Sequence, residues 1–135
     1  MSFEQRYERV LALARALEKH HDEVVDCAIR DLQFTVKDST REVDTTVNRL
    51  RMYADAVFLR DRLPLHPRAR VNLLLSYNGS AWLNTAITSI YVVGNRLTVK
   101  FSSKGRRIMA LTKDLYWPIF GDAVAFYSCF HCCPN

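Results

Sequence analysis

The chain has 135 residues, 49% of them hydrophobic, and a formal net charge of +5. This length and composition suit one globular domain over residues 1–135 with a real hydrophobic core. No apolar run approaches the roughly 18 residues of a membrane span. The N-terminus alternates charged and apolar residues, which is typical of a helix and not of a signal peptide. We therefore expect a cytoplasmic protein with no membrane partner.

The two halves of the chain differ in charge. Residues 1–62 carry 11 Lys and Arg against 12 Asp and Glu, whereas residues 63–135 carry 8 Lys and Arg against only Asp114 and Asp122. The balances are −1 and +6. The second half is therefore where we expect an anion to bind, either a nucleotide phosphate or a nucleic-acid backbone.

The cysteines do not form a spaced disulfide framework, which favours a reducing compartment. Cys27 stands alone, and three others crowd the last seven residues together with His131: Cys129, Cys132 and Cys133. Thiolates and imidazole are zinc ligands, but adjacent cysteines rarely share one tetrahedral ion and no second ligand pair lies upstream. We expect no metal site, and we interpret residues 128–135 as an atypical, poorly ordered tail.

Residues 1–62 are predicted to form a helical layer. Apolar residues recur at helical spacing in two segments that end near Leu32, with Asp22 as the expected N-cap of the second. A third helix is predicted from about Ser39 to Leu59. Ser39 and Glu42 have the spacing of a capping box.

The apolar period changes after a linker at 63–70, which contains two prolines. Short apolar runs predict strands at 71–77, 97–101 and 123–127. Longer segments predict a helix at 81–93, ended by Gly94-Asn95, and another halted near Pro118 and Gly121. Strand and helix alternate, so residues 71–127 are predicted to form a three-stranded parallel βαβαβ unit, half of a Rossmann sheet, in an α/β fold. Ligands of such sheets bind beyond the carboxyl ends of the strands.

Two motifs at those strand ends carry a resemblance. Tyr77-Asn78 matches the Trp-Asn pair of one motif, and Gly94-Asn95 with Lys100-Phe101-Ser102 matches a "GN…KPS" motif. Upstream, Glu42-Val43 and Met52-Tyr53-Ala54 stand where a Glu-Val and an aromatic-Ala pair are expected. With these residues the chain, from about residue 5 to 127, resembles the N-terminal portion of the NAD(P)-dependent aldehyde dehydrogenase superfamily.

The resemblance implies roles for single residues. Asn78 corresponds to the asparagine whose amide helps form the oxyanion hole, where a neutral donor meets a developing negative charge. Lys100 corresponds to the lysine that hydrogen-bonds the adenosine ribose, and Ser102 lies on the same loop. Many NAD-using members carry a glutamate against the ribose hydroxyls. This chain has Ser103 there, followed by Lys104, so we expect NADP to be preferred over NAD or at least tolerated.

Other positions depart from the family. Gly79-Ser80 replaces an aromatic-Pro pair, and the sequence after the third predicted strand does not continue as the family does. No cysteine can be assigned as the nucleophile, and the catalytic region with its general-base glutamate has no counterpart. We therefore expect a truncated or frameshifted dehydrogenase-like fragment that is inactive alone, with any substrate chosen elsewhere.

Two further hypotheses remain open. The chain can be a non-enzymatic interaction or oligomerisation module that keeps the fold as a scaffold. Alternatively, its basic half can bind nucleic acid, although it lacks both the aromatic-basic interleaving of single-strand binders and a helix-turn-helix pattern. An incomplete sheet leaves an edge and an apolar face open, so we expect a homo-oligomer.

Overall fold

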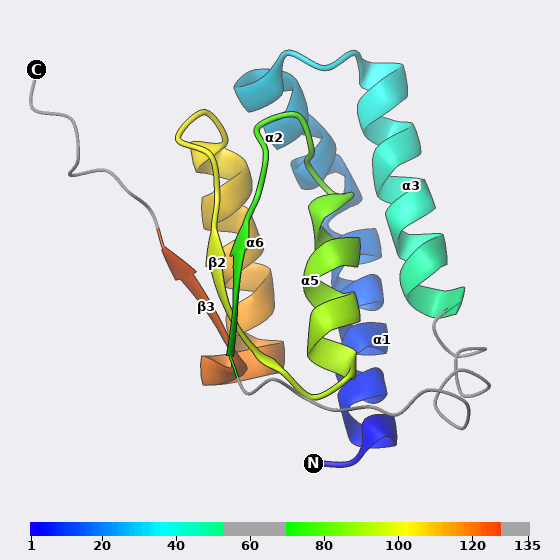
Figure 1. Ribbon diagram of the computed structural model, residues 1–135. Helices are drawn as coiled ribbons and strands as arrows, with labels where there is room; N and C mark the ends of the chain where they lie inside the picture. The colour runs from blue at the N-terminus through cyan, green and yellow to red at the C-terminus, as the bar shows by residue number, and fades with distance from the viewer. Residues whose placement is uncertain (53–69, 128–135) are drawn as a thin grey trace, which may run out of the picture.

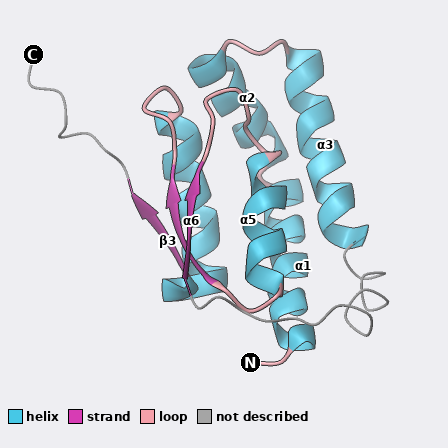
Figure 2. Ribbon diagram, viewed as in Figure 1, coloured by secondary structure: helices cyan, strands magenta, loops and turns pink. Residues whose placement is uncertain are grey.

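The computed structural model describes residues 1–52 and 70–127. Three helices come first: α1 (Phe3–Lys19), α2 (His21–Leu32) and α3 (Val36–Met52). Strands and helices then alternate: β1 (Arg70–Leu74), α5 (Leu83–Val92), β2 (Arg96–Lys100), α6 (Arg106–Phe120), a 3₁₀ turn (Gly121–Ala123) and β3 (Val124–Tyr127). The predicted α/β class, with helices first and a βαβαβ unit after them, is confirmed (Figure 2).

The three strands form one parallel sheet in the order β1-β2-β3. Paired residues of a parallel sheet point to the same face. Two rows form the apolar face: Val71, Leu97 and Val124 in one, and Leu73, Val99 and Phe126 in the next. The row made by Leu74, Lys100 and Tyr127 points to the opposite face, where all three side chains are exposed.

Helices α5 and α6 lie between the sheet and the first three helices (Figure 1). α5 packs against β2, α6 packs against β3, and both contact α1. Right-handed crossovers place both helices on one face when parallel strands follow one another in sequence order. The helical layer therefore reaches the sheet through α5 and α6, and one core joins all three layers.

The apolar stripe predicted for the first helix is buried as expected. α1 buries Tyr7, Val10, Leu13, Ala14 and Leu17. Ser2 caps this helix: its hydroxyl accepts from the main-chain N–H of Gln5, and the Gln5 side chain accepts from the N–H of Ser2. This reciprocal pair is a capping box that the sequence analysis did not predict.

Both predicted helix caps are wrong. α2 begins at His21, so Asp22 lies inside its first turn, where its carboxylate contacts His21. α3 begins at Val36, three residues before Ser39, because the hydroxyl of Thr35 accepts from the main-chain N–H of Asp38. Ser39 is fully buried within the helix. The predicted end of this helix at Leu59 lies outside the described residues.

The element ends in the second half differ from the predicted ones by a few residues. β1 ends at Leu74 instead of residue 77, and Arg70, which was assigned to the linker, begins it. The remaining linker residues, 63–69, and the tail, 128–135, lie outside the described residues. Gly94 ends α5 with a φ of 103°, a left-handed conformation that glycine adopts without strain. α6 continues through Pro118 to Phe120, and Gly121, with a φ of 55°, ends it.

Candidate functional site

The two motif loops meet at the carboxyl end of the sheet. The main-chain N–H of Leu75 donates to the carbonyl of Lys100 at 2.9 Å, which carries the pairing of β1 with β2 one residue further. Beyond this point the Lys104 ammonium lies 4.6 Å from the centre of the Tyr77 ring, a cation–π distance. Residues from both predicted motifs are therefore brought side by side.

The loop after β2 is a compact turn. The hydroxyl of Ser102 accepts from the main-chain N–H of Lys104 at 3.3 Å, and its carbonyl accepts from the N–H of Gly105 at 3.2 Å. Ser102 is half-buried, whereas Ser103 and Lys104 are exposed. Ser102 thus shapes the loop, and the exposed side chains of Ser103 and Lys104 are accessible to a ligand from solvent.

Lys100 ends β2 on the face of the sheet that α5 and α6 do not cover. Val99 and Phe101, its neighbours in sequence, point to the helix-covered face and are buried. Successive side chains of a strand alternate between faces. The Lys100 ammonium therefore lies at the carboxyl end of the sheet, on its open side, where the resemblance places a ribose.

Asn78 lies in the loop after β1 and is exposed. Its side-chain amide makes no hydrogen bond with another residue of the described ranges 1–52 and 70–127. The neighbouring Gly79 packs closely on Leu83, since a Cβ there would meet Leu83 Cδ2 at 2.8 Å and the leucine side chain would have to shift. Ser80 is buried. The Gly79-Ser80 departure from the family motif therefore makes specific local contacts in this fold.

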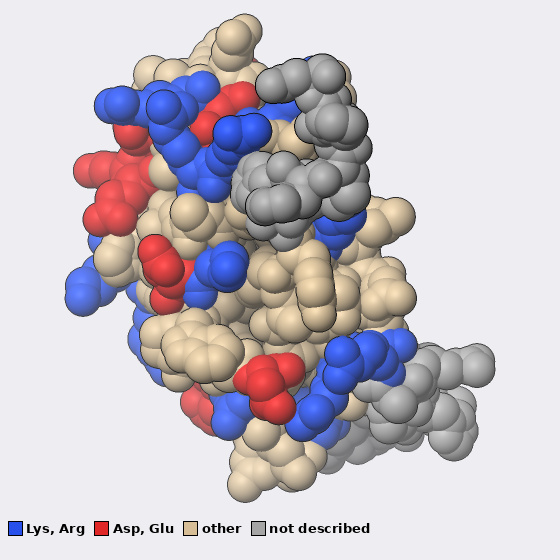
Figure 3. Space-filling view, turned by 90° about the vertical axis from the view of Figure 1, so that its left-hand side faces the viewer, with Lys and Arg blue, Asp and Glu red and all other residues tan. Residues whose placement is uncertain are grey.

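A shallow basic depression of about 600 Å³ adjoins the loop after β2. It lies where α2 ends and α6 begins, and six residues line it: Arg30, Asp31, Ser103, Lys104, Arg106 and Arg107. Figure 3 shows Lys and Arg side chains gathered at this end of the molecule. The second half of the sequence thus concentrates positive charge beside the candidate ribose site, as its balance of +6 predicts.

An acidic side chain from α2 already occupies the start of α6. One oxygen of Asp31 accepts from the main-chain N–H groups of Arg107, at 2.6 Å, and Ile108, at 3.1 Å. The other lies 3.3 Å from the Arg107 guanidinium. The Asp31 side chain is only 5% exposed. The partner of Arg107 in this structure is thus Asp31. A ligand phosphate must therefore use side chains here and not the helix N-terminus.

Glu42 provides an acidic acceptor at the start of α5, as Asp31 does at the start of α6. Its carboxylate accepts from the main-chain N–H and the hydroxyl of Ser80 and from the N–H of Trp82. The Arg49 guanidinium, also on α3, lies 3.9 Å from the centre of the Trp82 ring. This role of Glu42 could not be predicted from sequence patterns, because residues 42 and 80 are far apart in the chain. A partial signal was available: Trp82, the residue directly before α5, has no side-chain acceptor that could cap the helix.

Other groups in the described residues are less suited to chemistry. Burial, followed by the carboxylates of Asp31 and Asp26, raises the pKa of the Cys27 thiol, although Arg107 opposes this shift. A protonated, half-buried thiol is a poor nucleophile. Over residues 1–52 and 70–127, no three His, Cys, Asp or Glu side chains group as a metal site requires. No helix in these ranges is long and apolar enough to cross a membrane.

The fold is that of a part of the NAD(P)-dependent aldehyde dehydrogenases. The crystal structure of succinic semialdehyde dehydrogenase from Streptococcus pyogenes in complex with NADP⁺ matches with a TM-score of 0.80 and 15% identity. The crystal structure of glyceraldehyde-3-phosphate dehydrogenase GapN from Methanocaldococcus jannaschii complexed with NADP matches with a TM-score of 0.77 and 14% identity. The resemblance inferred from the motifs is thus confirmed as a likeness of fold.

The chain spans only part of these enzymes. The matches cover 92% and 95% of this chain but 30% and 32% of the two dehydrogenase chains. No protein-family model and no curated protein sequence matches it.

Proposed function

We propose that this chain is an aldehyde-dehydrogenase-like fragment that binds the adenosine side of NADP, and NAD less tightly. Lys100 hydrogen-bonds the adenosine ribose from the end of β2. The exposed Ser103 and Lys104 receive the 2′-phosphate, and Ser102 holds their loop in shape. The NADP named with both matched dehydrogenase structures supports this choice of ligand.

One observation carries the proposal. Lys104 bridges the two motif loops by lying over Tyr77, and the basic depression begins directly beside it. A doubly charged phosphate is drawn to such a cluster, since charge-assisted hydrogen bonds are stronger than neutral ones. A glutamate in place of Ser103 would repel the same phosphate.

We propose dinucleotide binding for this chain, and not catalysis. The related chemistry is the oxidation of an aldehyde or the reduction of an acyl group, which needs an activated cysteine and a general base. Asn78 is a candidate for the oxyanion hole only, and Cys27 is half-buried, with a pKa raised by burial, which makes its thiol a poor nucleophile. We infer that residues 1–135 turn over no substrate without a cysteine and a base from another segment.

The test separates the adenosine side from the rest of the cofactor. Thermal unfolding of the full chain is followed with NADP, NAD, 2′,5′-ADP and AMP. We expect stabilisation by NADP and 2′,5′-ADP, with weaker effects of NAD and AMP. Lys100→Ala and Lys104→Ala should each weaken binding by about tenfold, the loss of one charge-assisted hydrogen bond.

Lys37→Ala, on the exposed start of α3, is the matched control and should bind as the parent chain does. Absence of any shift at millimolar NADP would exclude the proposal and favour the scaffold hypothesis, a non-enzymatic interaction module. A shift with a DNA duplex that disappears as salt is raised would favour the nucleic-acid hypothesis instead.

A further inference from the structure

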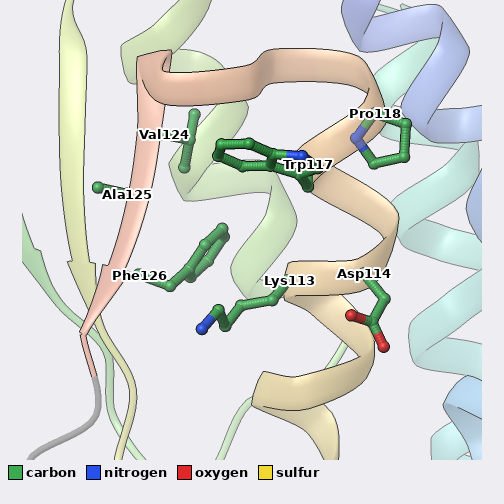
Figure 4. A pocket seen from close by; sticks show the side chains of 7 residues that line it. All are labelled: Lys113, Asp114, Trp117, Pro118, Val124, Ala125 and Phe126. Atoms are coloured by element: carbon green, nitrogen blue, oxygen red, sulfur yellow. The ribbon is translucent and has the colours of Figure 1, made fainter.

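The β3 edge of the sheet borders an apolar groove. β3 is an end strand of the described sheet, so its outer N–H and C=O groups have no strand partner among the described residues. A groove of about 490 Å³ lies between this strand and α6 (Figure 4). Seven residues line it: Lys113, Asp114, Trp117 and Pro118 of α6, and Val124, Ala125 and Phe126 of β3. An open edge of this kind is a template for pairing with another strand.

Trp117 dominates this groove and is 70% exposed. The neighbouring Tyr116 and the later Phe120 point the other way and are buried in the core. The indole therefore contributes little to the fold of one copy. Tryptophan is the residue most enriched at the energetic centres of interfaces. A large exposed indole beside an open strand edge marks a surface that another polypeptide covers.

The groove also carries two opposite charges. Lys113 and Asp114 are adjacent on α6, and both are exposed. Neither forms an ion pair with another described residue of the chain. Two antiparallel copies of such a helix, related by a two-fold axis near these residues, bring each lysine close to the carboxylate of the other copy. The surface is thus complementary to itself, as an isologous interface must be.

We propose that a second copy of this chain occupies the groove, with the two β3 strands paired antiparallel about a two-fold axis perpendicular to the sheet. This arrangement keeps α6 of both copies on one face. The two Trp117 indoles fill the space between the helices, and Lys113 faces the partner's Asp114.

The charge pair favours a second copy over an unrelated peptide. An extended segment of another protein could pair with β3 and cover Trp117. Only a second copy of this chain, however, necessarily carries charges complementary to both Lys113 and Asp114. The proposal does not rest on the dinucleotide site, because Lys100 and Lys104 lie outside this groove. Failure of either proposal therefore leaves the other standing.

Sedimentation equilibrium of the full chain over a range of concentrations tests the proposal. We expect a monomer–dimer equilibrium for the parent chain. Trp117→Glu should weaken the dimer by about thirtyfold or more, as loss of an interface tryptophan does. Lys113→Glu and Asp114→Lys should each weaken it by about fivefold, because each variant places like charges together twice in the dimer.

Recombining the charges provides the sharpest readout. An equimolar mixture of Lys113→Glu and Asp114→Lys chains should form heterodimers, and the doubly exchanged chain (Lys113→Asp with Asp114→Lys) should regain the parent affinity. Lys37→Glu, which reverses a lysine outside the groove, should change nothing. Circular dichroism checks that each variant is folded. A monomeric parent chain at every concentration, or a dimer that Trp117→Glu leaves intact, overturns the proposal; so does a dimer that ignores both charge reversals.

Discussion

The carboxylate of Glu42 accepts hydrogen bonds from both the main-chain N–H and the hydroxyl of Ser80, each at 2.8 Å. The same carboxylate accepts from the N–H of Trp82 at 3.0 Å. Asp31 makes the matching contact with the start of α6. The helical layer therefore supplies the acidic caps of both crossover helices, because neither has a capping side chain of its own. The two halves of the chain are linked by these caps as well as by the core.

Removing the Glu42 carboxylate should destabilise the whole domain. Glu42→Ala leaves two main-chain N–H groups and a buried serine hydroxyl without their acceptor, at a cost of about 2 kcal/mol. The measurement is urea unfolding followed by circular dichroism. Glu8→Ala, an exposed glutamate of α1, is the control and should change the free energy of unfolding by less than about 0.5 kcal/mol. Equal effects of the two substitutions would show that the contact is dispensable.

Asp31 should contribute more to the free energy of unfolding than Asp26 does. Both lie on α2 and pair with an arginine, but Asp26 and Arg30 form an exposed pair while Asp31 is buried and caps α6. Asp31→Ala should cost about 2 kcal/mol of unfolding free energy, from the lost cap and the favourable helix dipole. Asp26→Ala should cost at most about 0.5 kcal/mol. Similar unfolding midpoints for the two variants would contradict the capping role.

Sulfate should stabilise Asp31→Ala more than the parent chain. Without the carboxylate, the N–H groups of Arg107 and Ile108 face the basic depression with no acceptor, and a helix N-terminus of this kind attracts a doubly charged anion. Melting temperatures are compared in sodium sulfate and sodium chloride at matched ionic strength. A specific sulfate effect in Asp31→Ala, absent from Asp26→Ala, is the expected result. Identical responses of all three chains would show that the vacated terminus does not bind an anion.

The order of the helices and strands could be predicted from the sequence, whereas most of the contacts that position the site could not. Alternation of apolar runs and turn residues was enough for the order of strands and helices, because these are local patterns. Gly94 marked the end of α5 for the same reason. The acidic groups at the starts of α5 and α6 could not be predicted, because they depend on pairs such as Glu42 with Ser80, and spacing within one helix cannot reveal a partner 38 residues away. Local spacing instead suggested a capping box between Ser39 and Glu42.

For the candidate site, too, local features could be predicted from the sequence and long-range contacts could not. Lys100 and Lys104 could be named from a motif because both lie within one strand and its following loop. Pairing of Lys104 with Tyr77 and of Arg107 with Asp31 depends on how α2, β1 and α6 come together. Trp117 was hidden for a different reason: an exposed tryptophan and a core tryptophan look alike in a helical pattern. Its 70% exposure emerges only from the packing of α6.

Tyr116 should make the domain sensitive to alkaline pH. Its ring packs between Phe120 and Phe126, with centroid distances of 4.8 and 5.3 Å. Its hydroxyl is buried and has no hydrogen-bond partner among the described residues. Burial raises the pKa of Tyr116 well above the usual value of 10.0, because the phenolate would lose its hydration.

The sign of the pH effect follows from this shift. A raised pKa means that the folded state holds the phenolic proton more tightly than the unfolded state does. The stability of the domain is therefore unaffected by this group below about pH 10 and falls as the pH rises above that value, where only the unfolded chain ionises. Tyr116→Phe removes this contribution. It also removes a buried hydroxyl without a partner, so the variant should be as stable as the parent chain or about 1 kcal/mol more stable at neutral pH.

Urea unfolding of the parent chain and of Tyr116→Phe from neutral pH to about pH 11 measures both effects. The difference in unfolding free energy between the two chains should widen in favour of the variant above about pH 10, since only the parent chain loses the tyrosine contribution. Tyr127→Phe is the control, because Tyr127 is exposed and its removal should leave the pH dependence of the parent chain unchanged. Parallel pH profiles for the parent chain and Tyr116→Phe would mean that the Tyr116 hydroxyl reaches water in the folded state.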